Sequence, residues 1–252
     1  MQVQKLVFSN SEGAKLAARL ELPADQPPLA YALFAHCFTC TKNLTAIVTI
    51  SRALSNRGIA VLRFDFTGLG ESEGDFAETT FSSNVQDLIA TADFLEQNYA
   101  APKLLIGHSL GGAAVLHAAG YVSSSTAVAT IAAPATFDRF RRHLKSAAEK
   151  IETEGKAEVL LAGQAFTTKK RFIEDLDHAP MEEAVRNLSQ ALIIFHSSTD
   201  AVVNVESGLR IFEMAPYPKS YISLSGADHL LSNRRDSLYV GEVLAAWCQR
   251  YI

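Results

Sequence analysis

The feature of this sequence that most restricts its fold is the alternation of short apolar runs with longer helical patterns. Apolar runs of strand length are followed repeatedly by segments whose apolar residues recur at helical spacing. Such an alternation favours a mostly parallel sheet covered by helices on both faces. The chain has 252 residues and 48% hydrophobic content, enough to bury one large core. We therefore expect a single α/β domain over residues 1–252.

The strands and helices of this domain can be placed along the chain. Two apolar runs flank a polar turn at 9–13 and predict a hairpin at 2–8 and 15–22. Further strands are expected at 31–35, 59–64, 103–107, 127–132, 191–195 and 219–224. Helices are expected at 44–57, 81–98, 110–121 and 236–251.

Residues 136–190 interrupt the alternation. This segment is rich in charge, with short helices expected near 137–153 and 171–176 and a short strand at 158–162. It is too long for a plain connection between two strands. We expect it to form a small cap, inserted after the sixth strand, that covers a pocket.

A G-x-S-x-G motif, Gly107-His108-Ser109-Leu110-Gly111, lies between an expected strand and an Ala-rich helix. This context is typical of a nucleophile elbow, a sharp turn that presents a serine at the end of the sheet. Glycines at 107 and 111 remove side chains that would clash across the turn. Free N–H groups at the start of the helix favour negative charge nearby. The sequence therefore predicts Ser109 as a nucleophile, although the bare motif can also occur by chance.

A serine nucleophile needs a base and an acid, and the sequence supplies both. A serine hydroxyl is weakly nucleophilic near neutral pH unless a base is adjacent. Asp200 and His229 follow Ser109 in the order serine, acid, histidine, and each lies just past an expected strand. We expect His229 to take the serine proton, and Asp200 to orient the imidazole and stabilise its charged form.

Other residues compete with these assignments. Asp228 adjoins His229, but neighbours on a tight loop point apart. Asp138 follows the sixth strand and is kept as a minor alternative for the acid. His108, inside the elbow, is expected to be structural, and His196, on a strand, is expected to pack or hydrogen-bond locally.

Acyl transfer also requires donors directed at the oxyanion. One donor is expected to be the backbone N–H of Leu110, the residue after the nucleophile. The loop after the third strand, HCFTC at 36–40, resembles the His-Gly-Phe-x-Gly loop of many esterases, with cysteines in place of glycines. This resemblance implies the N–H of Phe38 as second donor, with Cys37 or Thr39 as alternatives.

Cys37 and Cys40 also form a C-x-x-C motif. A redox or metal site would need a helix N-terminus or a second pair of ligands, and neither is evident. Three cysteines in the whole chain do not make a disulfide framework. We expect ordinary buried thiols beside the site, which could make the protein sensitive to alkylating reagents.

Two further patterns are interpreted as structural. The glycine-rich segment 63–74 has the spacing G-x-G-x-x-x-G, and the next helix is expected only near residue 81, so a dinucleotide loop is disfavoured. It is expected to form a tight loop beside the site. The basic runs at 139–145 and 169–171 are expected to be solvated faces of the cap; attraction of an anionic substrate is the weaker interpretation.

Composition argues against several classes of partner. The net charge is −4, from 23 basic and 27 acidic residues, and no basic stripe indicates a nucleic-acid partner. The first residues show no basic region followed by an apolar one, so we expect no signal sequence, and no apolar run of about 20 residues predicts a membrane span. We expect a cytoplasmic protein with no membrane partner, no cofactor and no metal. The sequence leaves the oligomeric state open.

Five segments together resemble one bacterial family. They are HCFTCTKN, LRFDFTGLGESEGDF, TTFSSNVQDL, GHSLGGAAVL and ATIAAPA. They are similar to the α/β-hydrolase module that is often fused to a C-terminal OsmC-type domain, a type often labelled esterase or serine aminopeptidase-like hydrolase. The resemblance implies an α/β-hydrolase fold with Ser109, Asp200 and His229 as the triad. The chain ends at Ile252 after the last expected helix, so we expect the second domain to be absent.

These expectations converge on one activity. The favoured function is a carboxylesterase-like serine hydrolase that cleaves a small-molecule ester or thioester through an acyl-enzyme on Ser109. Peptide or amide hydrolysis and acyl transfer on the same triad are alternatives. A non-catalytic binding protein on a hydrolase scaffold is the rival from another class, but it would not require all three triad residues.

Overall fold

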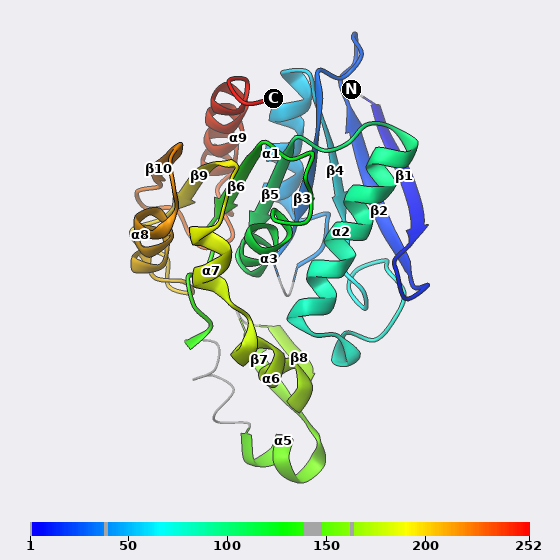
Figure 1. Cartoon of the computed structure of the whole chain (residues 1–252), viewed down its shortest axis with the longest axis vertical. Coiled ribbons are helices and arrows are strands. Elements are labelled where there is room, and N and C mark those ends of the chain that lie inside the picture. Colours follow the sequence, from blue (N-terminus) through cyan, green and yellow to red (C-terminus); the bar gives the residue numbers. More distant parts are fainter. Residues whose placement is uncertain (1, 38–39, 139–147, 162–163) are drawn as a thin grey trace.

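A computed structural model of the protein describes residues 2–37, 40–138, 148–161 and 164–252. In this part of the chain an eight-stranded sheet runs in the order β1-β2-β4-β3-β5-β6-β9-β10 (Figure 1). Its strands are β1 (Gln2–Ser9), β2 (Lys15–Leu22), β3 (Ala30–Ala35), β4 (Ile59–Phe64), β5 (Leu104–His108), β6 (Ala127–Ile131), β9 (Ala191–His196) and β10 (Lys219–Ser223).

The sheet is mostly parallel. β1 pairs antiparallel with β2, and β2 pairs antiparallel with β4. The remaining neighbours, from β4 to β10, pair in parallel. The predicted hairpin and the predicted parallel sheet are both confirmed.

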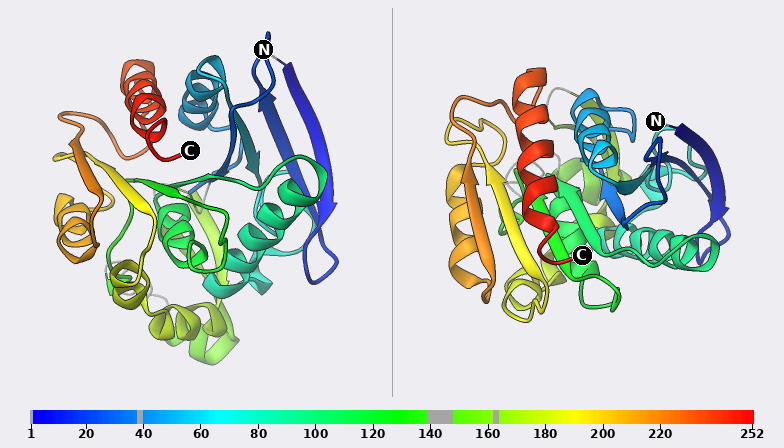
Figure 2. Two further views of the ribbon diagram at one scale, coloured as in Figure 1. Left: turned by 45° about the horizontal axis from the view of Figure 1, so that its top comes forward. Right: turned by 90° about the horizontal axis from the view of Figure 1, so that it is seen from above.

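Helices cover both faces of the sheet (Figure 2). α1 (Thr45–Asn56) and α9 (Arg234–Cys248) pack on one face, whereas α2 (Phe81–Asn98), α3 (Leu110–Ala118) and α8 (Val205–Met214) pack on the other. The residues of β3 alternate between the two cores: Leu33 and Ala35 face α2 and α3, whereas Ala32 and Phe34 face α1 and α9. This alternation follows from the two-residue period of a strand.

The segment expected to form a cap extends away from the sheet (Figure 1). It contains α5 (Ala148–Glu154), β7 (Lys156–Leu161), β8 (Gln164–Lys169), α6 (Lys170–His178) and α7 (Met181–Arg186). β7 and β8 form a separate antiparallel hairpin. The helix expected at 137–153 lies partly outside the described residues, and α5 overlaps its end. The sequence did not predict β8, α7 or α8.

Polar contacts join this segment to the body of the protein. A short 3₁₀ turn, η1 (Phe76–Glu78), precedes α2 and ends with Glu78, which pairs with Lys169 and Arg171. Asp175 accepts hydrogen bonds from the backbone N–H and the hydroxyl of Ser82, both at 2.7 Å. The basic run at 169–171 is thus bound to carboxylates, whereas the run at 139–145 lies outside the described residues.

In the ranges that the structure describes, no helix combines the length and the apolar character needed to cross a bilayer.

Candidate active site

Ser109 lies at a sharp turn between β5 and α3. Its backbone has a positive φ of 54°, a conformation that costs energy for a residue with a side chain. Its N–H donates to the carbonyl of Ile131 in β6 at 2.8 Å, which holds the turn against the neighbouring strand. A Cβ at Gly107 would overlap the carbonyl of Gly111. The glycines of the motif are therefore required by close backbone approach, as the sequence predicted.

The structure brings Ser109, His229 and Asp200 together in one hydrogen-bonded chain. Ser109 Oγ lies 3.0 Å from His229 Nε2, and His229 Nδ1 lies 2.8 Å from Asp200 Oδ2. The three residues come from segments that follow β5, β9 and β10, and these strands are parallel. With its proton on Nδ1, the imidazole donates to Asp200 and leaves Nε2 free to accept the serine proton.

The environment of Asp200 keeps its carboxyl ionised. Its Oδ1 accepts backbone N–H groups from Val202 at 2.8 Å and Val203 at 2.9 Å. Burial by itself would raise the pKa of Asp200. The hydrogen bond to His229, the charge of that ring and the two backbone N–H groups outweigh burial, so the pKa lies below its usual value. A charged carboxylate can therefore stabilise an imidazolium at neutral pH.

The competing acids lie elsewhere. Asp228 is exposed, and its Oδ1 accepts the N–H of Ser232 at 2.9 Å. Asp138 is also exposed, and it accepts a hydrogen bond from the hydroxyl of Thr136 at 2.9 Å. The His229 ring therefore has Asp200 as its carboxylate partner.

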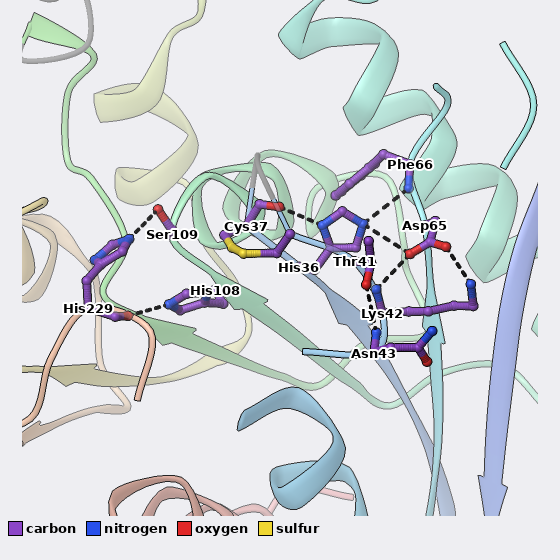
Figure 3. The surroundings of a disulfide bond; sticks show 11 residues. His36, Cys37, Thr41, Lys42, Asn43, Asp65, Phe66, His108, Ser109 and His229 are labelled. Carbon is purple, nitrogen blue, oxygen red and sulfur yellow. Dashed lines mark hydrogen bonds and ion pairs between the residues drawn. A yellow bond between two sulfur atoms is a disulfide. The ribbon is translucent and has the colours of Figure 1, made fainter. Parts of the chain in front are cut away.

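Two buried histidines hold the loops of the acid and the base. His108 Nε2 donates to the backbone carbonyl of His229 at 2.7 Å (Figure 3). Burial, and then the charge of the His229 ring, lowers the pKa of His108 to about 3, so this ring stays neutral. His196 Nε2 donates to the carbonyl of Val203 at 2.9 Å, and burial lowers its pKa as well. The sequence predicted structural roles for both histidines but not their hydrogen-bond partners. His229 is far from His108 in the sequence, and the contact between His196 and Val203 depends on the shape of the loop that follows β9.

The loop after β3 differs from the expectation for its cysteines. Cys37 and Cys40 are joined by a disulfide, with their Cα atoms 5.2 Å apart. The N–H of Cys40 donates to the carbonyl of Cys37 at 3.1 Å, a turn that brings the two side chains to the same side. The expectation of two ordinary thiols was wrong, because the sequence alone did not reveal this turn.

Of the two expected oxyanion donors, the structure describes Leu110. Leu110 is the first residue of α3, and N–H groups in the first turn of a helix have no acceptor within that helix. Phe38 and the alternative Thr39 lie outside the described residues. The loop itself packs closely on α3, since a Cβ at Gly111 would overlap the carbonyls of Ala35 and His36.

A buried polar cluster that the sequence did not predict holds the loop after β3 (Figure 3). The fully buried ammonium of Lys42 pairs with the fully buried carboxylate of Asp65, whose Oδ1 also accepts the N–H of Lys42 at 2.7 Å. Asp65 Oδ2 accepts the N–H of Glu71 at 2.9 Å, and a Cβ at Gly70 would overlap this carboxylate. The glycine-rich segment therefore passes close to a buried ion pair, which explains Gly70 without a nucleotide.

A small, largely apolar cavity adjoins the elbow. It has room for about one water-sized group. The amide Oδ1 of Asn84 is buried and has no hydrogen-bond partner among the described residues. The cavity is lined by His36, Phe66, Leu69, Phe81, Asn84, Leu110, Gly111 and Ala114.

No metal centre is found among the described residues. In these ranges no three histidine, cysteine, aspartate or glutamate side chains are arranged to hold a metal ion. The described site is arranged for transfer of the Ser109 proton to His229, with the charged carboxylate of Asp200 stabilising the imidazolium.

Curated relatives include hydrolases of thioesters. The chain is 24% identical over 197 residues to mouse palmitoyl-protein thioesterase ABHD10, a mitochondrial protein. That match covers 75% of this chain and 65% of the relative, so the chain spans less than two thirds of that protein. The human protein of the same name is 33% identical over 104 residues, 38% of this chain and 33% of its own length.

Solved structures agree with the fold. The esterase domain of a Rhodothermus marinus protein is 50% identical, with a TM-score of 0.83, and the match covers 100% of this chain and 99% of that one. Est1E of Butyrivibrio proteoclasticus, solved with ferulic acid, is 20% identical with a TM-score of 0.81 over 98% of both chains. At that identity, the second likeness shows the fold alone.

The family model described as the alpha/beta hydrolase family matches residues 32–251. This range includes most of β3, all strands from β4 to β10 and every residue of the hydrogen-bonded chain. The fold, the match to this model and the 50% identical esterase domain lead to one conclusion. The protein belongs to the alpha/beta hydrolase family.

Proposed function

We propose that this protein is a serine hydrolase that cleaves small esters or thioesters through an acyl-enzyme on Ser109. The observation that carries this proposal is the hydrogen-bonded chain from Ser109 Oγ through His229 to Asp200. A serine, an imidazole and a carboxylate in this order form the relay that activates a hydroxyl nucleophile.

The first half of the reaction forms the acyl-enzyme. Ser109 Oγ attacks the carbonyl carbon of the substrate while His229 Nε2 takes the hydroxyl proton. Asp200 keeps the other proton of the ring on Nδ1 and stabilises the imidazolium. When the tetrahedral intermediate collapses, the bond to the leaving group breaks. His229 returns its proton to the departing alkoxide or thiolate, and the acyl group stays on Ser109.

The second half releases the acid. His229 takes a proton from a water molecule, whose oxygen attacks the acyl carbon. The ester bond to Ser109 then breaks, and the serine oxygen recovers the proton from His229. In both halves we propose that the oxyanion is bound by the N–H of Leu110 and by a second donor from the loop after β3, assigned to Phe38.

The substrate class is argued from the relatives. The 50% identical structure is named an esterase domain, and the mouse relative is named a palmitoyl-protein thioesterase. We therefore propose a small-molecule acyl substrate with either an oxygen or a sulfur leaving group.

The test combines turnover with labelling of the nucleophile. Purified protein should hydrolyse p-nitrophenyl acetate and react with a fluorophosphonate probe, whereas Ser109→Ala should do neither because the nucleophilic oxygen is absent. The exposed Ser123 provides a matched control, and Ser123→Ala should behave like the parent. Labelling that persists in Ser109→Ala would remove Ser109 from its proposed role. An unlabelled and inactive parent would favour the binding-protein alternative.

A further inference from the structure

The Cys37–Cys40 disulfide lies between two buried anchors of the loop after β3 (Figure 3). Before it, the His36 ring contacts the carbonyl of Cys37 at 2.6 Å through Nδ1 and accepts the N–H of Phe66 through Nε2 at 3.4 Å. After it, Lys42 is held by its buried pair with Asp65. The disulfide therefore links the two ends of the stretch from Cys37 to Cys40, which lies between these anchors in the sequence.

This stretch begins where the loop contacts the helix of the nucleophile. The carbonyls of Ala35 and His36 approach Gly111 so closely that even a methyl group would overlap them. Gly111 is two residues after Ser109, in the first turn of α3. A change in the backbone after His36 would therefore alter how the loop packs on α3. This contact is on the side of the Ser109 turn where we propose the second oxyanion donor. Oxyanion donors act only when they are aimed at the developing charge.

The two cysteines differ in exposure. Cys37 is 4% exposed, whereas Cys40 is half-buried. Exchange begins when a thiolate attacks one sulfur of a disulfide and the other leaves. We infer that a small thiol attacks at Cys40, the more exposed of the two residues, and that Cys37 is the leaving group.

The remaining cysteine makes a contrast. Cys248 is buried in α9, and burial raises the pKa of its thiol to about 12. A thiol with so little thiolate at neutral pH is inert to exchange and to alkylation. Among the three cysteines, the pair at 37 and 40 is therefore where thiol–disulfide exchange can act.

We propose that Cys37 and Cys40 form a thiol–disulfide exchange site for small dithiols, and that the disulfide form holds the loop in its active arrangement. A thiolate of the dithiol attacks Cys40 Sγ, the S–S bond breaks, and its electron pair leaves on Cys37 Sγ, which takes a proton. The second thiolate of the dithiol then attacks its own sulfur in the mixed disulfide and releases Cys40, which takes a proton in turn. The protein disulfide gains two electrons, and the dithiol is oxidised to a cyclic disulfide. The coupling to turnover rests on the proposed hydrolase function.

The experiment measures thiols and turnover on the same samples. Purified protein is equilibrated with graded ratios of reduced and oxidised dithiothreitol and divided. One part is quenched with iodoacetamide for mass spectrometry; the other is freed of dithiothreitol and assayed with p-nitrophenyl acetate. Two new thiols should appear in a single transition, located at Cys37 and Cys40 by peptide mapping. Over the same transition kcat should fall at least about tenfold with little change in KM, because loss of one oxyanion donor costs about 10²–10³ in kcat. Reoxidation should restore kcat.

Two variants separate this coupling from general damage. Cys40→Ser cannot form the bond, so its kcat should match that of the reduced parent and should not respond to dithiothreitol. Cys248→Ala should keep both the thiol transition and the activity transition. Circular dichroism of the reduced parent should show the folded spectrum.

Several outcomes would overturn the proposal. If the disulfide resists reduction while the protein stays folded, or if the reduced protein unfolds, the bond serves to stabilise the fold and is not an exchange site. Complete reduction with unchanged or higher kcat would refute the coupling to the active site. If neither redox form reacts with a fluorophosphonate, the hydrolase function fails and the coupling fails with it. The thiol count would still decide whether exchange occurs.

Discussion

At the scale of single residues, the two oxygens of Asp200 have separate tasks. Oδ1 accepts two backbone N–H groups, from Val202 and Val203, whereas Oδ2 faces His229 Nδ1. An aspartate can satisfy both sides because all of its lone pairs are acceptors. An asparagine has one acceptor and one donor, so its side chain can satisfy only one side.

This difference predicts the effect of Asp200→Asn. With the amide oxygen kept by the two backbone N–H groups, the amide NH₂ would face His229 Nδ1 and force the ring proton onto Nε2. That tautomer cannot take the serine proton. We expect kcat for ester hydrolysis to fall by about 10⁴, as for the same change in a protease triad.

Asp138→Asn is the matched control for this substitution. Asp138 is exposed and accepts from Thr136, so its amide variant should keep kcat close to that of the parent. A larger loss in Asp138→Asn than in Asp200→Asn would show that the acid has been misassigned.

The sequence predicted the three residues of the hydrogen-bonded chain, but not what supports them. Ser109 was marked by its motif, and Asp200 and His229 by their order and their positions after strands. The support from His108 to the carbonyl of His229 joins positions that are 121 residues apart. Such a contact has no local pattern, because it depends on where two loops meet in space.

At the scale of elements, the site depends on how closely the loop after β3 packs on α3. Gly111 is where they meet, because the carbonyls of Ala35 and His36 occupy the space that a side chain would need. The contact couples the backbone beside the disulfide to the helix that starts after Ser109.

Gly111→Ala should therefore impair both folding and activity. The added methyl group must displace backbone atoms, and we expect a loss of at least about 1–3 kcal/mol in the free energy of unfolding. The kcat should fall as well, because the loop moves relative to Ser109. Urea denaturation and ester turnover measure the two effects.

A second glycine provides the comparison for Gly111→Ala. Gly120 follows α3, and a Cβ there would be 3.9 Å from the nearest atom, the carbonyl of His117. Gly120→Ala should change the free energy of unfolding by less than about 0.5 kcal/mol. Equal losses in both variants would mean that close packing at Gly111 is not the cause.

The elements that the sequence did not predict have a physical explanation. α8 contains Gly208, which weakens a helical pattern. The structure needs this glycine, since a Cβ there would be 2.7 Å from Nδ1 of the buried His196 ring. β8 pairs only with β7, so its strand character comes from a local hairpin outside the main sheet. In both cases tertiary contacts decide what local sequence leaves open.

At the scale of the whole molecule, buried histidines make folding depend on pH. The pKa of His108 is about 3 in the folded protein, because burial disfavours its charged form. In the unfolded chain the pKa is about 6.5. Between these values the unfolded state binds a proton that the folded state does not, so stability falls as the pH falls. This contribution is complete above about pH 6.5 and is lost progressively toward about pH 3.

His108→Gln should weaken this dependence. The glutamine amide can still donate to the carbonyl of His229 but does not titrate. Between about pH 5.5 and 4, the slope of the unfolding free energy against pH should be shallower than in the parent by about 1.4 kcal/mol per pH unit. Urea denaturation at several pH values gives both slopes.

An exposed histidine serves as the control for this pH measurement. His178 is solvent-exposed at the end of α6, so His178→Gln should leave the slope as it is in the parent. Superimposable pH dependences for the parent and His108→Gln would show that the buried ring is not a source of acid sensitivity.

The division of the interior into two cores also limits how the protein can diversify. Neighbouring residues of β3 belong to different cores, so inserting or deleting one residue there would exchange the two faces over the rest of the strand. Insertions or deletions in the loops at the strand ends would not exchange the two faces, because these loops lie outside the paired residues. New substrate preferences should therefore arise by lengthening or exchanging loops, while strand lengths are inherited unchanged.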